Sequence, residues 1–278
     1  MGDLIAAEWL KLRKRPMTWW LLGILAFVVS AVFLGSYAFS FFRTRGGGDP
    51  ASAEAARSLI VLPRGPATAL SAVSFLFDSL LMIAIAVVLG NEYQFGTLRT
   101  HLATGVGRVP YLVAKIVAVL LAGLAGLVAM LLFGTILSLI ATAVTRHDFA
   151  FRGAFGAALW QTVGVLLLGT LARFAIALFV TTLARSVAAG AAVSLGFNLV
   201  EGTLVGILMG VGGGYARLAN GLISPNLRAL SPGLNRATSS GAHLLPPAAA
   251  AAVLVACVFV GVAASLAVFI RRDVTGAA

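Results

Sequence analysis

Six long apolar stretches constrain the fold of this 278-residue chain more than any other feature of its sequence. A transmembrane helix needs about 20 consecutive, mostly apolar residues. Six stretches reach that length: 17–41, 68–90, 111–144, 154–184, 187–210 and 247–270. Only 10% of the residues are charged, against about 25% in a soluble domain. The sequence therefore predicts an all-α polytopic membrane protein with six transmembrane helices in a single domain over residues 1–278.

The basic residues predict the orientation of this domain. The formal net charge is +11, but most Lys and Arg residues flank the apolar stretches, which is typical of membrane proteins and gives no reason to expect a nucleic acid partner. If both termini are cytoplasmic, the cytoplasmic side carries ten of the 20 Lys and Arg residues and the outside nine. The ten lie in shorter segments near span ends and include all three lysines, so we predict cytoplasmic termini. The rarity of lysine is typical of a GC-rich bacterial genome, so we expect a bacterial cytoplasmic membrane.

No motif in the sequence predicts chemistry carried out by this chain. It contains no G-x-x-x-x-G-K-[ST] phosphate-binding loop, so we expect no ATPase site. His101, His147 and His243 lie in separate polar segments, without an H-E-x-x-H or paired-carboxylate pattern. We therefore predict no catalytic residues, no metal site and no cofactor bound by this chain.

Residues 1–16 form a basic, amphipathic segment before the first apolar stretch. Leu4, Ile5, Trp9 and Leu12 recur at helical spacing, and basic residues cluster after them. Such a helix can lie in the headgroup layer of the cytoplasmic leaflet, attracted by anionic membrane lipid. The alternative is that the basic cluster only fixes the orientation of the first span.

The loop at 91–110, between the second and third stretches, is the most informative segment. Gly96-Thr97 provides a turn and an N-cap, after which 98–103 can form one or two helical turns that end at Gly105. Leu98 and Leu102 are four residues apart and share one face of that short helix. A short helix held outside the membrane suits a docking surface for a soluble partner. The alternative is a capped connection without a partner.

The same loop resembles a known family. Glu92-Tyr93, Gly96-Thr97-Leu98-Arg99, Leu102, Gly105 and Arg108 match the pattern E-[YF]-x-x-G-T-L-[RE]-x-x-L-x-x-G-x-x-R of the ABC type-2 permeases, the membrane subunits of type V ABC exporters. That family's pattern continues to a lysine, for which Lys115 stands here. The N-terminal Glu8, Lys11-Leu12-Arg13, Arg15-Pro16 and Trp19 also resemble that family's amphipathic helix. Six spans with both termini inside fit as well, so the resemblance covers essentially the whole chain.

The resemblance implies an exporter half without a fused ATPase. A second permease copy or a paralogue would complete the dimer, and a separate ABC ATPase subunit would bind ATP and Mg²⁺. The 91–110 loop would be its coupling helix, with these coupling residues: Glu92, Tyr93, Gly96, Thr97, Leu98, Arg99, Leu102 and Arg108. Exporters of this kind handle drugs, antibiotics, peptides or lipids.

Three ionisable residues fall inside the apolar stretches: Asp78, Arg173 and Glu201. At 1.5 Å per residue from the cytoplasmic ends, they lie at depths of about 18, 16 and 21 Å. We therefore predict a shared polar layer near mid-membrane, with Asn198 as a further member. Charges at this depth are costly and face protein or water. The layer either lines a translocation pathway or is a static ion pair between Arg173 and one of the two acids.

Four glycines, Gly202, Gly206, Gly210 and Gly214, recur every fourth residue around the end of the fifth stretch. Glycine at this spacing lets helix backbones approach closely in a membrane. We predict a close helix–helix contact along these residues, either within the fold or across a dimer.

Two functional hypotheses from other classes compete with the exporter subunit. An ion-coupled secondary transporter would use Asp78 and Glu201 as proton or cation sites, but the two halves of the chain show no convincing repeat. A membrane enzyme would need a catalytic constellation that the sequence lacks.

Overall fold

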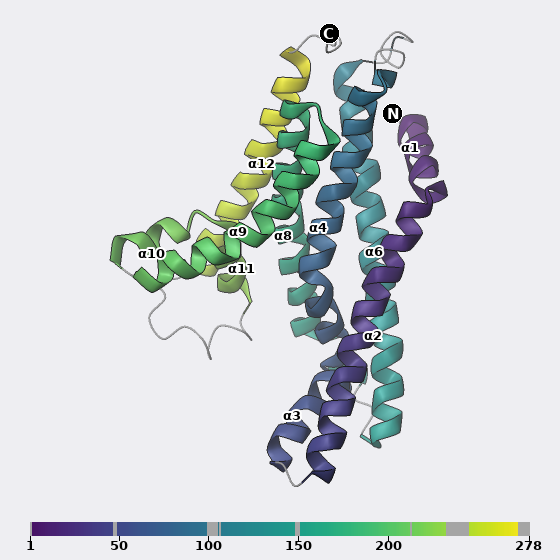
Figure 1. Cartoon of the computed structure of the whole chain (residues 1–278), viewed down its shortest axis with the longest axis vertical. Helices are drawn as coiled ribbons and strands as arrows, with labels where there is room; N and C mark the ends of the chain where they lie inside the picture. Colours follow the sequence, from purple (N-terminus) through teal and green to yellow (C-terminus); the bar gives the residue numbers. More distant parts are fainter. Residues whose placement is uncertain are drawn as a thin grey trace. The chain divides into compact units, whose positions relative to one another are not determined.

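The structure, a computed structural model, describes residues 2–46, 49–98, 105, 107–147, 151–211, 213–231 and 245–271. In this part of the chain every regular element is a helix (Figure 1). In chain order these are α1 (Gly2–Lys14), α2 (Pro16–Arg45), α3 (Pro50–Ile60), α4 (Gly65–Gln94), α6 (Arg108–Thr145), α7 (Phe151–Ala154), α8 (Ala157–Ala184), α9 (Val187–Val211), α10 (Gly213–Ala219), α11 (Ile223–Leu230) and α12 (Pro247–Arg271). The predicted all-α fold class is confirmed.

Six of these helices are long and apolar enough to cross a membrane: α2, α4, α6, α8, α9 and α12. Their bounds differ from the predicted spans by at most four residues, so the prediction of six candidate spans is also confirmed. The longest, α6, has 38 residues and a length of about 57 Å at 1.5 Å per residue. It therefore exceeds the hydrocarbon core of a bilayer, which is about 30 Å thick.

Local sequence explains where several helices begin and end. Pro16 and Pro50 occupy the first turn of α2 and α3, where the fixed φ of proline suits a helix and its missing N–H is not needed. The Asp49 carboxylate caps α3 by accepting a hydrogen bond from the Ala51 N–H at 3.0 Å. Arg185, with a φ of +52°, ends α8, and α9 begins two residues later.

Contacts divide the chain into two compact units. The first contains residues 1–12, 78–121 and 165–278, and the second contains 13–77 and 122–164. In the first unit, Gly90 of α4 lies so close to the start of α9 that a Cβ atom there would come within 2.7 Å of the Val187 backbone nitrogen. Glycine is therefore required for this close approach of two helices.

Helix α11 is the main difference from the sequence-based expectation for the first unit. The sequence analysis places all of 211–246 outside the spans, because the segment is rich in Gly, Pro and Asn. In the structure, Ile223 of α11 belongs to a hydrophobic cluster with Ala172 of α8 and Leu254 of α12. Because Ala172 lies near the middle of α8, α11 packs at mid-span depth rather than at a span end.

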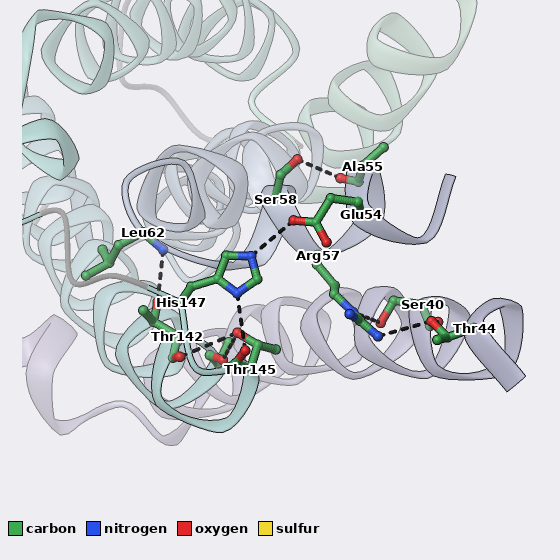
Figure 2. Close-up of polar contacts among 11 residues, drawn as sticks. Ser40, Thr44, Glu54, Ala55, Arg57, Ser58, Leu62, Thr142, Thr145 and His147 are labelled. Carbon is green, nitrogen blue, oxygen red and sulfur yellow. Dashed lines mark hydrogen bonds and ion pairs between the residues drawn. The ribbon is translucent and has the colours of Figure 1, made fainter. Parts of the chain in front are cut away.

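In the second unit, α3 packs along the C-terminal part of α2 (Figure 1). The Arg57 guanidinium donates a hydrogen bond to the Thr44 hydroxyl of α2 at 3.1 Å. The Leu62 N–H donates to the Thr142 hydroxyl of α6 at 3.0 Å, and both contacts are visible in Figure 2. Polar contacts thus fix the segment between α2 and α4 against the end of α6.

Candidate functional site

An ion pair closes the base of the 91–110 loop. Glu92 lies in the last turn of α4 and Lys115 in the second turn of α6, and their charged groups are in direct contact. The second carboxylate oxygen of Glu92 accepts a hydrogen bond from the Tyr111 hydroxyl at 2.5 Å. The Lys115 side chain is only 1% exposed, which a lysine tolerates only when it is paired. The helices on both sides of the loop are therefore fastened together.

Helix α1 joins the same contact through Glu8. The Lys115 ammonium lies 2.9 Å from one Glu8 carboxylate oxygen, and Lys11 lies 2.7 Å from the other. Burial opposes ionisation of Glu8, but the two ammonium groups outweigh it and hold the pKa of this carboxyl below 4.5. We call Glu8, Lys11, Glu92, Tyr111 and Lys115 the loop-base cluster. Its two carboxylates and two ammonium groups balance in charge.

Further elements of the first unit meet at the same loop base. The Arg108 guanidinium donates a hydrogen bond to the Ile270 carbonyl near the end of α12 at 2.9 Å. The Arg185 guanidinium, between α8 and α9, lies 6.0 Å from the centre of the Tyr93 ring, at the limit of a cation–π contact. The N-terminal helix, the two ends of the 91–110 loop, the α8–α9 turn and the end of α12 therefore lie close together in the first unit.

The most exposed large apolar residue of the described part of the loop is Phe95, not Leu98. Leu98 is 2% exposed and packs inside its own chain, whereas Phe95 is 72% exposed. The expectation that Leu98 presents its side chain to a partner is therefore corrected, because this side chain is buried within the chain itself. Phe95 stands between Gln94 and the turn at Gly96, which has a φ of +66°. Its apolar character at a turn is the sequence signal that could have identified it.

Other predicted loop residues occupy defined places or lie beyond the description. Tyr93, like Glu92, belongs to the last turn of α4, so the connection begins later than 91. Thr97 has a helical backbone and an exposed side chain. Arg99 and Leu102 lie outside the described residues.

The structure brings the three intramembrane charges together. The Arg173 guanidinium of α8 donates a hydrogen bond to Asp78 of α4 at 2.6 Å and lies 3.5 Å from Glu201 of α9. Thr170 donates a second hydrogen bond to Asp78. The remaining Glu201 oxygen accepts a hydrogen bond from the Ser224 N–H at the start of α11, at 2.7 Å. We call Asp78, Arg173 and Glu201 the mid-span triad.

Asn198 lies beside this triad and bonds to α4 next to Asp78. Its amide donates hydrogen bonds to the Ser79 hydroxyl at 2.9 Å and to the Met82 sulfur at 3.7 Å. Asn198 therefore contacts the residue after Asp78 on α4. Sequence reasoning missed Thr170 and Ser224, because uncharged hydroxyl residues give no signal of depth in an apolar stretch.

The mid-span triad is incompletely satisfied. It contains two carboxylates and one guanidinium. Within the described part of the chain, the Nε of Arg173 and the Oε2 of Glu201 are buried and have no hydrogen-bond partner. Buried polar atoms without partners are uncommon in proteins, and charged residues inside a membrane usually mark functional positions.

The glycine stripe makes no close contact inside the chain as far as the description reaches. A Cβ atom at Gly202, Gly206 or Gly210 would have no atom within 4 Å. Gly214 lies in α10, beyond the end of α9. The sequence left open whether the stripe contacts a helix within the fold or a helix across a dimer. The structure gives no support for the contact within the fold at these three positions.

A sequence model of one protein family, described as ABC-2 family transporter protein, matches residues 4–205. No curated protein and no solved structure matches the chain significantly. The matched region contains most of α1, the whole loop base except the contact with α12, and the mid-span triad. It covers more than half of the chain and includes four of the six candidate spans and most of a fifth. The chain therefore belongs to the ABC-2 transporter family and is a multi-pass membrane permease of an ABC transporter.

Proposed function

We propose that this chain is the transmembrane half of an ABC exporter, coupled through its 91–110 loop to a separate ABC ATPase subunit. Membership in the ABC-2 family implies association with an ABC ATPase in general. The observation that carries the proposal is the loop base, where contacts join α1, α4, α6, α12 and the α8–α9 turn. A displacement of the loop would therefore act on several helices at once.

ATP and Mg²⁺ would bind to the partner subunit. The chain has no phosphate-binding loop, so we expect the purified chain to show no ATPase activity of its own. ATP hydrolysis that persists after removal of co-purifying ATPases would contradict this part of the proposal.

The side of the membrane on which the loop would lie follows from where the partner ATPase obtains its ATP. A soluble ATPase draws on cytoplasmic ATP, so the loop would face the cytoplasm of a bacterial cell. Because α1 and the end of α12 contact the same loop base, both termini would be cytoplasmic as well. The exposed Lys11, Arg13 and Lys14 on α1 would then lie where anionic headgroups attract them.

Phe95 is the proposed docking residue. A large apolar side chain that is 72% exposed just after the end of α4 gains stability when a partner covers it. Truncating a buried interface anchor commonly costs about 2 kcal/mol or more, which is about thirtyfold in affinity. Truncating Leu98 would be a poor test of docking, because this side chain is buried within the chain and its loss would disturb the fold of the loop itself.

The test is co-purification and ATP hydrolysis in nanodiscs with Phe95→Ser and, as a control, Phe42→Ser. Phe42 is 71% exposed and lies near the C-terminal end of α2. We expect Phe95→Ser to lose the ATPase subunit by about thirtyfold, with Phe42→Ser unchanged. Equal binding of the ATPase by wild type and both variants would contradict docking at Phe95.

The glycines of α9 support a contact with a second permease, either a copy or a paralogue. Gly206 and Gly210 present an open backbone surface without an internal neighbour, which suits close packing between helices. Gly206→Leu should therefore weaken dimerisation without lowering the thermal stability of the chain. Gly164→Leu in α8, another glycine with nothing within 4 Å, is the control. Unchanged dimerisation in Gly206→Leu would mean that this face contacts lipid.

A second candidate function, an ion-coupled secondary transporter, is favoured by one observation. The mid-span triad has one more carboxylate than cation, which suits a proton or cation site. Exporters of the proposed class move drugs, antibiotics, peptides or lipids in an ATP-dependent manner. Transport that follows an imposed proton gradient, requires Asp78 or Glu201 and needs no ATP would favour this alternative over the exporter.

A further inference from the structure

We propose that Lys115 is a positioning residue that fixes the register of α1 on the loop base, and that this contact makes α1 part of the coupling site. This inference rests on the proposed function, because the site it extends is the proposed coupling loop. Lys115 is suited to the role because its ammonium group contacts carboxylates on two different helices, Glu8 of α1 and Glu92 of α4.

Glu8 lies on the inward face of α1, where it pairs with Lys115. The inward face of α1 is otherwise apolar and carries Leu4, Ile5, Trp9 and the buried Leu12. An apolar stripe alone allows a helix to rotate or slide by one turn at small cost, whereas one buried polar contact specifies a single register. Glu8 is the acidic residue on that face, and its partner Lys115 is fully buried.

Negatively charged and aromatic groups surround the Lys115 side chain. Its ammonium group contacts Glu8 at 2.9 Å, contacts Glu92 directly, and lies 4.8 Å from the centre of the Tyr111 ring. Two carboxylates and an aromatic face therefore surround one cation. Without that cation, Glu8 and Glu92 would face each other as like charges in a largely buried place, and α1 would be repelled from the loop base.

The consequence for coupling follows from chain connectivity. After α1, a single residue, Arg15, leads into α2. A loop that moves when the ATPase subunit binds nucleotide would therefore move α1 only while the contact between Lys115 and Glu8 is intact. The ATPase subunit would still dock at Phe95 without this contact, because Phe95 lies on the loop itself.

The first experimental arm needs only this chain. Hydrogen–deuterium exchange of α1 is measured on the purified protein in nanodiscs for wild type, Lys115→Met and Glu8→Gln. Asp3→Asn and Lys14→Met remove exposed charges from the same helix and serve as controls. We expect Lys115→Met to speed exchange in 2–14 at least tenfold, Glu8→Gln to speed it less, and the controls to stay within twofold of wild type. Wild-type exchange in Lys115→Met would overturn the proposal.

The second arm uses the complex with the co-purifying ATPase subunit, trapped with ATP and vanadate. In wild type we expect nucleotide to change exchange both in 91–98 and in 2–14. In Lys115→Met, the change in 91–98 should remain and the change in 2–14 should disappear. If both changes persist in Lys115→Met, the proposal fails, whereas absence of any bound ATPase in wild type contradicts the proposed function and leaves the first arm decisive for Lys115.

Discussion

The loop-base cluster and the mid-span triad are both built from buried carboxylates around a cation, but they differ in balance. The loop-base cluster pairs Glu8 and Glu92 with Lys11 and Lys115. The mid-span triad pairs Asp78 and Glu201 with Arg173 alone. In the described part of the chain, the triad also leaves the Nε of Arg173 and the Oε2 of Glu201 without hydrogen-bond partners.

This difference suggests different roles for the two groups. The loop-base carboxylates are 12% and 13% exposed, so water reaches them and the balanced charges hold helices together at moderate cost. In the triad Glu201 is only 1% exposed, and an excess negative charge in a low dielectric is expensive. The loop-base cluster is therefore suited to holding helices together. The mid-span triad is suited to being a site whose charge or partners change.

The largest expected effect comes from removing the one cation of the triad. Arg173→Met leaves two buried carboxylates facing each other and should destabilise the protein by about 3–5 kcal/mol. Asp78→Asn should restore more stability than Glu201→Gln, because Arg173 lies 2.6 Å from Asp78 and 3.5 Å from Glu201. Thermal melting in detergent measures this series.

Arg217→Met, at an exposed position of α10, is the control for the loss of an arginine. If neither second substitution improves Arg173→Met, the three charges act independently. Pathway lining would then explain them better than mutual pairing.

A smaller loss is expected at the loop base. Lys115→Met should cost about 2 kcal/mol, the scale of a lost charged hydrogen bond, because Glu8 and Glu92 can partly regain water. Adding Glu8→Gln and Glu92→Gln to Lys115→Met should recover stability by removing the like charges. The same melting assay, with Lys14→Met as control, compares this loss with that of Arg173→Met. A larger loss of stability in Lys115→Met than in Arg173→Met would contradict the expected difference between the loop-base cluster and the mid-span triad.

Acid should open the loop base through Glu8. Its pKa is held below 4.5 in the folded chain, so the stabilisation is present above pH 4.5 and is lost as the pH falls below that value. The protection of 2–14 against hydrogen exchange, corrected for the intrinsic pH dependence of amide exchange, should therefore fall on acidification. Glu8→Gln should exchange faster at neutral pH and show a flatter pH profile. A wild-type profile in Glu8→Gln would assign the acid effect to another carboxyl.

The smallest effect is expected in the second unit, from the pair of His147 and Glu54. This pair is more exposed than the loop-base cluster and the mid-span triad. His147 Nε2 lies 3.1 Å from Glu54 (Figure 2), and this hydrogen bond raises the pKa of His147 above 6.5. The pair therefore contributes fully below pH 6.5, and its contribution is lost as the pH rises through the raised pKa. Because the side chains are 32% and 58% exposed, the contribution should stay below about 1 kcal/mol. NMR titration of His147 in wild type and Glu54→Gln measures it, and equal pKa values would contradict the pairing.

The sequence was sufficient to predict features that depend on the length and depth of apolar stretches. Six candidate spans follow from the length and apolar composition of the stretches. Counting residues from span ends placed Asp78, Arg173 and Glu201 at a common depth, and the structure puts their charged groups in contact. The opposite charges of Glu92 and Lys115 stand at the two ends of one motif, but the motif does not reveal that they touch.

Features that depend on tertiary packing were beyond the sequence. Leu98 has the helical spacing of a docking residue, but only the surrounding chain determines that it is buried. Helix α11 has eight residues, too few for a span, and its polar neighbours favour an outside position. Its Ser224 N–H nevertheless binds Glu201, and no local pattern encodes that contact. Glu8, which forms an ion pair with Lys115, lies more than 100 residues before it in the sequence.

Site-specific photocrosslinking would show whether the 91–110 loop contacts the proposed ABC ATPase subunit. A benzoylphenylalanine replaces Phe95 in one variant and the similarly exposed Phe42 in another, each co-expressed with the proposed ATPase subunit. We expect a crosslink from position 95 to the ATPase subunit and none from position 42. Crosslinks from position 95 only to lipid, with the ATPase subunit still bound to the permease, would contradict the assignment of this loop as the coupling site.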